Sequence, residues 1–416
     1  MNLKYLFGTL LVAGTLSFTS CSDEQGGSTE VSIEVTLPTN LKDELTITGG
    51  SYTFKNVSTG LETTVDYADK KVMLVDGLYN ISFTGTAYYN YDPNEEKPQT
   101  RGLVFNVAVQ GVQQNVTIKG GRLELNLALN IRYLNEKGNF VIAEIFPSGT
   151  LNPATNKQYN GDQYFRIYNN SDETLYADGL VIMESEFTTV RKMNYMPNIM
   201  DKAVTVQVVA MIPGSGRQYP VEPGKSMVIG DNALNHKEAN PASIDLSGAD
   251  FEWFTNSTSS SVVDADNPAV PNLNMLYNYT KTIWILNKQA NKAYLIGRLP
   301  KDVTPEDYLN KYTYTYKYEL ATGMTSKDIT SYYFPNEWII DAVNLSPRNS
   351  YVWNVTNSAL DMGFASVGLN NTIAENAGKA VVRKIEKTVD GRAVLKDTNN
   401  STEDFDHAVN ATLLTK

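Results

Sequence analysis

The sequence predicts an all-β protein in which a small β-sandwich precedes a larger one. Tyrosine occurs 25 times in 416 residues, and it suits the half-buried surface of a pleated sheet. Residues 31–37 alternate strictly between apolar and polar side chains, as a half-exposed strand does, and residues 51–57 follow the same pattern as far as Lys55. Helical periodicity is scarce. We expect two short helices, at 304–311, where Thr304 precedes Pro305 as an N-cap, and near 373–377.

The first 20 residues have the features of an export signal that is removed from the mature protein. Lys4 supplies a positive charge, and residues 6–16 are mostly apolar. This run is shorter than the about 20 apolar residues that span a bilayer, and it has the length and position of a signal-peptide core. No later segment reaches about 18 uninterrupted apolar residues, so we expect no transmembrane helix.

A lone cysteine follows this signal. Ser20 and Cys21 come directly after the apolar run, and a small residue before such a cysteine resembles the lipobox of bacterial lipoproteins. The resemblance implies that Cys21 carries the lipid anchor. Phe18 stands where the commonest lipobox has leucine, as it does in lipoproteins of the Bacteroidetes type. The alternative is an unmodified cysteine after an uncleaved signal. Because the chain has one cysteine, lipidation leaves none for a disulfide.

The lipidated Cys21 and a polar tether are predicted to occupy residues 21–30. The tether lets the body stand away from the lipid. A second interpretation is an address, since Ser22, Asp23 and Glu24 resemble the surface-export signal of Bacteroidetes lipoproteins, although only two acids are present. That resemblance implies an outer-membrane protein displayed on the cell surface. The alternative is an anchor that faces the periplasm.

The charge of the chain excludes two classes of partner. Removing the signal deletes Lys4 and no acid, so the formal net charge moves from −11 to −12. Nucleic acid demands a basic face, so we expect no nucleic-acid partner. An acidic protein is not drawn to an anionic membrane surface either, so the lipid has to hold it at the membrane.

Residues 31–134 are predicted to form the small sandwich. The short strands are separated by turns such as Asp76-Gly77, and their spacing suits a sandwich of about 100 residues. The pattern resembles the transthyretin-like and Ig-like modules of secreted bacterial proteins. The predicted strands lie at 31–37, 51–57, 71–75, 78–83, 102–109, 115–119 and 122–130.

Residues 138–416 are predicted to form the larger sandwich, after a boundary at 135–138 that is rich in charge and glycine. Several segments resemble the lamin-tail domain, an Ig-like sandwich used for binding. Arg166 stands where that family often has glutamate, and Leu180 where it has tryptophan. The segments that carry the resemblance are 140–146, 163–180, 219–229, 338–343, 378–384 and 397–405.

The order of these segments resembles the uncharacterised Bacteroidetes lipoprotein family DUF4876. This resemblance implies a companion of outer-membrane transport or barrel proteins. Fold alone does not decide function. Residues from about 231 to 332 lack matching landmarks and are predicted to be a long insertion, and loops of that length are often where function lies.

The residue types that catalysis requires are scarce. The two histidines, His236 and His407, lie in polar segments, and we expect His236 to be a solvated loop residue. Neither has the neighbours of a nucleophile elbow or of a zinc-protease helix. The sequence also lacks a phosphate-binding loop and a dinucleotide fingerprint. We therefore expect a protein that is not an enzyme and has no cofactor or metal.

Three clusters of polar or soft side chains resemble parts of metal sites. Asp264 and Asp266 begin like a calcium loop but lack the glycine and glutamate that such a loop needs. The acids and amides of the terminal turn suit Asx-type turns better than a metal site. The methionines suit an adaptable apolar patch better than copper or haem ligation. The turn residues are Asp397, Asn399, Ser401 and Asp404, and the methionines are Met183, Met193, Met196, Met200 and Met211.

The sequence thus favours a non-catalytic, lipid-anchored binding or assembly protein, with an outer-membrane β-barrel such as an iron transporter as its partner. The alternative is a hydrolase or metal-dependent enzyme whose site consists of dispersed carboxylates. A concave pocket with converging acids would favour the enzyme, and a flat tyrosine-rich face the binding protein. Tyrosine and tryptophan dominate binding hot spots. The candidate partner-binding aromatics are Tyr88, Tyr89, Tyr91, Trp253, Tyr277, Tyr279 and Trp284.

Overall fold

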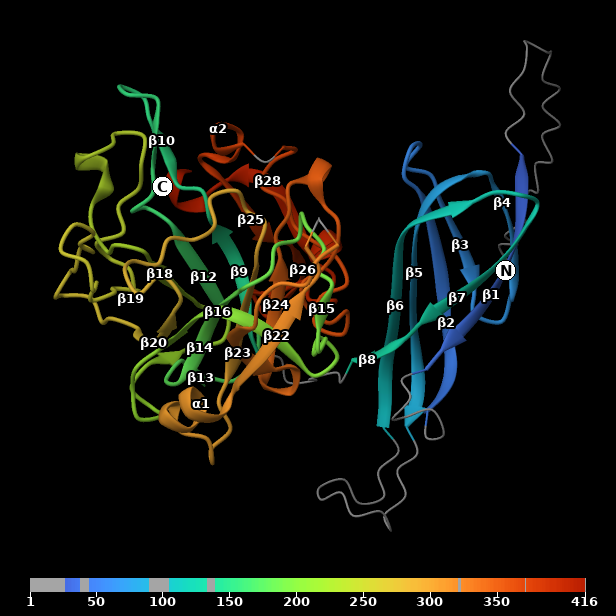
Figure 1. Ribbon diagram of the computed structural model, residues 1–416, viewed down its shortest axis with the longest axis horizontal. Helices are drawn as coiled ribbons and strands as arrows, with labels where there is room; N and C mark the ends of the chain where they lie inside the picture. The colour runs from blue at the N-terminus through green and yellow to red at the C-terminus, as the bar shows by residue number, and fades with distance from the viewer. Residues whose placement is uncertain are drawn as a thin grey trace, which may run out of the picture.

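The computed structural model describes residues 27–37, 45–89, 105–132, 139–320, 323–370 and 372–415. Within these residues the chain consists of many strands and a few short helices, so the predicted all-β sandwich fold is confirmed. Strands β1–β8 pair only with one another, and so do β9–β28 (Figure 1). No helix in the described part of the chain is long and apolar enough to cross a membrane.

The first eight strands form two sheets, in the orders β4-β1-β7 and β3-β2-β5-β6-β8. Alternating side chains of both sheets fill the space between them, among them the fully buried Val31, Phe54 and Phe83. The strands are β1 (Ser28–Thr36), β2 (Leu45–Asn56), β3 (Glu62–Asp66), β4 (Lys71–Val75), β5 (Gly77–Tyr89), β6 (Phe105–Ile118), β7 (Arg122–Ala128) and β8 (Asn130–Arg132).

Two local predictions in this region differ from the structure. The pair Asp76-Gly77 does not close a hairpin, because β4 pairs with β1 whereas β5 pairs with β2 and β6. It carries the chain from one sheet to the other, and Asp76 accepts a hydrogen bond from Thr29 of β1 at 2.6 Å. The segments 102–109 and 115–119 were predicted as two strands. Their residues 105–109 and 115–118 belong to the single strand β6, which pairs with β5. Residues 102–104 lie outside the described residues.

The later strands form a six-stranded sheet, β19-β18-β12-β9-β25-β28, and an eight-stranded sheet. The latter has the order β15-β22-β23-β16-β14-β21-β24, with β20 also paired to β16. Small two-stranded sheets complete this part of the chain. The strands are β9 (Phe140–Phe146), β10 (Thr150–Asn152), β11 (Lys157–Tyr159), β12 (Tyr164–Asn169), β13 (Leu175–Tyr176), β14 (Leu180–Ser185), β15 (Tyr195–Met196), β16 (Ala203–Met211), β17 (Pro220–Val221), β18 (Ser226–Gly230), β19 (Phe251–Glu252), β20 (Asn274–Asn278), β21 (Ala293–Arg298), β22 (Thr313–Tyr318), β23 (Ile329–Pro335), β24 (Ile339–Asn344), β25 (Lys379–Arg383), β26 (Ile385–Val389), β27 (Arg392–Leu395) and β28 (Phe405–Asn410).

The main core of this sandwich lies between its two sheets. Phe165 and Ile229 come from the six-stranded sheet, and Ile182 and Ile296 from the eight-stranded sheet, and all four are almost fully buried. The central strands are apolar on both faces because a second cluster, which includes Val181 and other outward-facing residues, covers the far side of the eight-stranded sheet. These strands are therefore continuous apolar runs rather than alternating ones.

Both predicted helices are present. Helix α1 (Pro305–Lys311) begins after Thr304, whose hydroxyl accepts a hydrogen bond from the amide of Asp307 in a capping box. Helix α2 (Ile373–Asn376) coincides with the second prediction, and α3 (Ser401–Asp404) lies in the terminal turn. Short 3₁₀ turns complete the structure: η1 (His236–Glu238), η2 (Asn336–Trp338), η3 (Arg348–Ser350) and η4 (Thr412–Thr415).

The stretch 231–332 is more than the insertion that the sequence predicted. Strand β21 falls within it, and this strand lies between β14 and β24 in the eight-stranded sheet. Strands β20 and β22 also belong to that sheet. The missing landmarks misled the prediction because short or irregularly spaced strands leave little periodicity in a sequence.

Candidate binding site

Several candidate residues lie outside the part of the chain that the structure describes. These are the lipidation site Cys21, the residues Ser22, Asp23 and Glu24, and Tyr91. The boundary at 135–138 lies outside it as well. Tyr88 and Tyr89 are described by their backbone, which pairs with β2 and β6 at the end of β5.

Two candidate aromatics belong to the core and not to a binding surface. Trp253 is 0% exposed and Trp284 is 1% exposed. Their ring centroids are 5.0 Å apart, and the indole Nε1 of Trp253 donates a hydrogen bond to the backbone oxygen of Trp284 at 3.0 Å. The prediction that these two rings contact a partner is therefore wrong, because aromatic side chains also alternate into a sandwich core.

The other two candidates belong to an accessible aromatic cluster. Tyr279 is 54% exposed, and Tyr277 is half-buried with its ring 4.3 Å from that of Tyr332. Tyr308 of α1 is buried and connects the rings of Tyr332 and Tyr312. We call the partly exposed rings of this group the aromatic cluster. The rings that contact one another are Tyr277, Tyr312, Tyr314, Tyr332, Tyr333 and Trp338. Tyr279 follows two residues after Tyr277 and is grouped with them by its place in the chain.

Most residues of this cluster were not predicted from the sequence. The alternating Tyr314, Tyr316 and Tyr318 of β22 were the signal that could have found it, because alternate residues of a strand share a face. This pattern lies inside the stretch 231–332, which was predicted to be an insertion. The buried Tyr316, whose ring stacks on that of Tyr314, donates a hydrogen bond from its hydroxyl to Glu186 at 2.6 Å, so a carboxylate lies next to the cluster.

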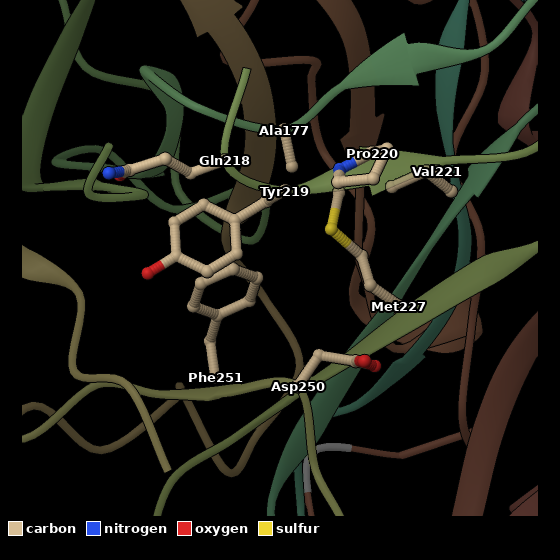
Figure 2. Close-up of a pocket in the computed structure, with 8 residues that line it drawn as sticks. All are labelled: Ala177, Gln218, Tyr219, Pro220, Val221, Met227, Asp250 and Phe251. Carbon is tan, nitrogen blue, oxygen red and sulfur yellow. The ribbon is translucent and has the colours of Figure 1, made fainter. Parts of the chain in front are cut away.

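A small pocket lies at the edge of the six-stranded sheet, between the β13–β17 ribbon and strands β18 and β19. It has a volume of about 190 Å³. Figure 2 shows the ring of Tyr219 lying against that of Phe251, with Met227 beside them. The two ring centroids are 4.9 Å apart in an edge-to-face arrangement. The lining residues are Ala177, Gln218, Tyr219, Pro220, Val221, Met227, Asp250 and Phe251.

The pocket combines a buried apolar floor with a polar rim. Ala177, Val221, Met227 and Phe251 are buried members of the main core. Gln218, Pro220 and Asp250 are exposed around them. Asp250 is the one acid of the lining, and its carboxylate accepts a hydrogen bond from the amide of Val228 at 2.7 Å. The pocket thus offers an apolar cavity with one acceptor rather than converging acids.

Asp178 holds the loop that supplies Gln218 and Tyr219 to the pocket. Its carboxylate accepts hydrogen bonds from the backbone amides of Gly216, Gln218 and Tyr219, at 2.8 to 2.9 Å. Burial by itself would raise the pKa of Asp178, but these three donors outweigh it and hold the pKa below its ordinary value. Gly214 has a φ of +124° and packs so closely on Asp178 that a Cβ would lie 2.3 Å from the carboxylate. The loop that presents Tyr219 is therefore preorganised.

Four acids gather under the loops that follow β18: Asp162, Asp231, Glu252 and Asp264. Burial raises the pKa of each carboxyl group, and neighbouring acids raise that of Asp231 further. The two carboxylate oxygens of Glu252 accept hydrogen bonds from the backbone amides of Ala233 and Asn267, both at 2.7 Å. Asp162, Asp231 and Glu252 are at most 4% exposed and Asp264 is half-buried, so this group organises loops from within.

The structure corrects the prediction for His236. This residue is buried rather than solvated. Its Nδ1 lies 2.9 Å from the hydroxyl of Tyr159, and its Nε2 lies 2.7 Å from the backbone oxygen of Asn232. His407 accepts a hydrogen bond from the amide of Ser366 at 2.9 Å and lies 3.0 Å from the backbone oxygen of Thr402. Burial lowers its pKa. His236 thus connects its loop to the Tyr159 side chain, and His407 connects two segments through backbone groups.

The other sequence clusters serve the fold. Asp404 accepts hydrogen bonds from the amide and hydroxyl of Thr398, both at 2.7 Å, and Asn400 caps α3. Met183 is buried in the outer core whereas Met196 is 73% exposed, so the methionines form no single patch. Within the described ranges, no group of three or more histidine, cysteine or acidic side chains is arranged to hold a metal ion.

Comparisons with known proteins identify a family but no activity. Residues 222–412 match the model of the family described as "Protein of unknown function (DUF4876)". A crystal structure of a DUF4876 family protein from Bacteroides thetaiotaomicron VPI-5482 matches with a TM-score of 0.56 and 21% identity. The match covers 92% of this chain and 96% of that chain. It shows a shared fold. No curated protein matches the chain.

Proposed function

We propose, from the premise that this chain belongs to the DUF4876 family through residues 222–412, that it is a non-catalytic binding protein anchored at the outer membrane. The pocket of Figure 2 receives one apolar side chain of its partner. The observation that carries this proposal is the pocket itself, a preorganised cavity whose floor belongs to the core and whose rim carries one carboxylate.

The size of the pocket supports an anchoring role. A cavity of about 190 Å³ is below the about 300 Å³ at which small-molecule sites usually begin. It suits a single side chain, and binding hot spots consist of such side chains inserted into well-packed pockets. The half-buried Tyr219 adds an aromatic wall with a hydroxyl group, which favours an apolar residue with polar neighbours.

The proposed location rests on the N-terminal sequence. The apolar run at 6–16 and Ser20-Cys21 support export and lipidation, and Asp23 and Glu24 support display on the cell surface. A chain with a formal charge of −11 gains nothing from an anionic leaflet, so the lipid supplies the attachment.

The proposed partner is an outer-membrane β-barrel that imports a scarce nutrient such as iron. The shared membrane and the resemblance to a transport-associated lipoprotein family support this choice. An acidic, tethered body is also suited to a partner with a basic outer surface, since complementary charge steers association.

The test captures the tagged, full-length protein from membranes that are solubilised in mild detergent. We expect a β-barrel to co-elute with the wild type, and Tyr219→Ala to reduce its recovery because the pocket loses a wall. Tyr279→Ala is the matched control, since it removes the same side chain from a 54% exposed position outside the pocket. Thermal unfolding of each variant checks that the fold is intact.

Two outcomes would contradict the proposal. If the wild type elutes alone from iron-starved and iron-replete cells, the barrel is not its partner. If the barrel co-elutes but Tyr279→Ala reduces recovery and Tyr219→Ala does not, binding belongs to the aromatic cluster and not to the pocket.

A further inference from the structure

Three polar side chains from distant parts of the chain meet inside the larger sandwich. Glu184 belongs to β14, Gln207 to β16, and Lys292 directly precedes β21. Strand β14 lies between the other two in the sheet. The residues are 2%, 9% and 6% exposed, respectively. None of them lines the pocket of Figure 2.

The amine of Lys292 and the carboxyl group of Glu184 both contact the side-chain carboxamide of Gln207. The Nζ of Lys292 donates a hydrogen bond to Oε1 of Gln207 at 3.2 Å. The same amine donates to the backbone oxygen of Glu186, which orients it. On the other side, Nε2 of Gln207 donates a very short hydrogen bond to Oε1 of Glu184. The nitrogen of the carboxamide is thus in contact with the carboxyl group, and its oxygen with the amine.

The surroundings favour the uncharged form of both ionisable groups. Trp284 and Tyr294, which are 1% and 0% exposed, lie beside the carboxyl group of Glu184 and keep water out. Burial lowers the pKa of Lys292 and raises that of Glu184, and in both cases it outweighs the attraction between the two groups. A neutral amine is a nucleophile, and a protonated carboxyl group is a proton donor.

We propose that Lys292 and Gln207 join in an intramolecular isopeptide bond, with Glu184 as the proton-transfer group. The neutral Nζ attacks Cδ of Gln207 and forms a C–N bond. Glu184 gives its proton to Nε2 as the Cδ–Nε2 bond breaks, and takes a proton from the attacking nitrogen. A primary amide and an amine become a secondary amide and ammonia. Nothing is oxidised or reduced, and no co-reactant is needed.

The geometry explains why these residues are suited to the reaction. Burial in a packed core holds the amine and the carboxamide together, and such positioning replaces a bimolecular encounter. Glu184 lies on the strand between the two others, so one carboxyl group reaches the carboxamide without disturbing either strand pairing. The product ties β16 to β21 across β14, and thus connects two strands that share no hydrogen bonds in the sheet order.

Peptide mapping of the full-length protein, purified from membranes and denatured before digestion, tests the proposal. Trypsin cuts after Lys202, Arg217, Lys288 and Arg298. We expect peptide 203–217 joined to peptide 289–298, at the sum of their masses less about 17 Da for one ammonia. The joined species lacks the cut after Lys292, because trypsin does not cleave at an acylated lysine.

Glu184→Gln keeps both reacting residues and removes the proton donor. We expect it to reduce the joined peptide about a hundredfold or more, the range of a general acid–base contribution. Lys292→Arg is the second control and abolishes the joined peptide. If the wild type yields peptides 203–217 and 293–298 separately and no joined species, the proposal is overturned. This result does not depend on whether the two variants fold. Equal joining in Glu184→Gln overturns the role of Glu184.

Discussion

At the scale of single residues, Arg383 is the positive charge that connects the C-terminal turn to the strands of the larger sandwich. Its guanidinium lies 2.6 Å from Asp341, 3.4 Å from Asp397 and 3.7 Å from Asp404, and it donates to the backbone oxygen of Ile142 at 2.8 Å. Arg383 and Asp341 are almost fully buried, so neither charge has water as an alternative partner. This one side chain connects β24, β25, β9 and the terminal turn.

Arg383→Met therefore leaves buried carboxylates without a counter-ion. We expect the free energy of unfolding to fall by about 3 to 5 kcal/mol, the usual cost of breaking a buried ion pair from one side. Urea denaturation measures it. Arg122→Met is the matched control. Its side chain is 79% exposed and 3.7 Å from Glu30, so we expect a change below about 1 kcal/mol. Similar losses in both variants would contradict this account.

A second residue, Asp361, makes stability depend on pH. Burial raises its pKa to about 7, although the amides and side chains of Asn344 and Ser401 donate to it and partly offset that effect. The folded state thus keeps a proton at pH values where the unfolded chain has lost it. The stability from this group is complete below about pH 4 and is lost as the pH rises through about 7.

We expect Asp361→Asn to lower stability at every pH but to flatten the profile between pH 4 and 7. Each unit of pKa shift corresponds to about 1.4 kcal/mol. Comparing urea unfolding of the variant and the wild type at pH 5 and pH 8 isolates this group. If the difference between the two proteins is the same at both pH values, the raised pKa of Asp361 is refuted.

At the scale of elements, helix α1 supports part of the aromatic cluster through its capping box. Thr304 accepts from the amide of Asp307 at 3.1 Å, and Asp307 accepts from the amide of Thr304 at 3.3 Å. The helix has seven residues, which is too short to be stable alone, so the cap and the buried Tyr308 hold it in place.

Thr304→Ala should lower the free energy of unfolding by about 1 kcal/mol, as loss of an N-cap does. Lys311→Ala is the control. It removes an exposed ion pair with Asp307 one turn away, so we expect a smaller loss of stability than in Thr304→Ala. Hydrogen exchange of the α1 amides adds a local measurement, and unchanged protection in Thr304→Ala would argue against the cap.

At the scale of the whole molecule, we expect the proposed attachment to the membrane to be separate from folding. Among the described residues, which begin at residue 27, both sandwiches have apolar cores of their own. We expect Cys21→Ala to lose the lipid and leave the membrane fraction while keeping the circular-dichroism spectrum of the wild type. Palmitate labelling measures the first effect. Labelling that persists in Cys21→Ala would refute lipidation at this residue.

Much of the fold could be predicted because its causes are local. The apolar pattern of a segment such as β9 or β4 predicts a strand. The pair Thr304-Pro305 predicts the start of α1, because these residue types cap a helix. Such patterns depend on residues within a few positions of one another. The same locality caused the errors. Nothing near Asp76 indicates that the next strand joins another sheet, and nothing near residue 110 indicates that β6 continues to pair with β5.

The sequence by itself determined the fold class, most strands, both helices and the charge of the chain. Only the tertiary structure decided which side chains meet. The pocket joins Ala177, Tyr219, Met227 and Phe251 from four separate segments, and the buried Glu184–Gln207–Lys292 group joins three strands that are distant along the chain. The physical reason is that periodicity assigns a residue to a face of its own strand, whereas its neighbour across the core depends on sheet order and register, which arise from packing of the whole chain.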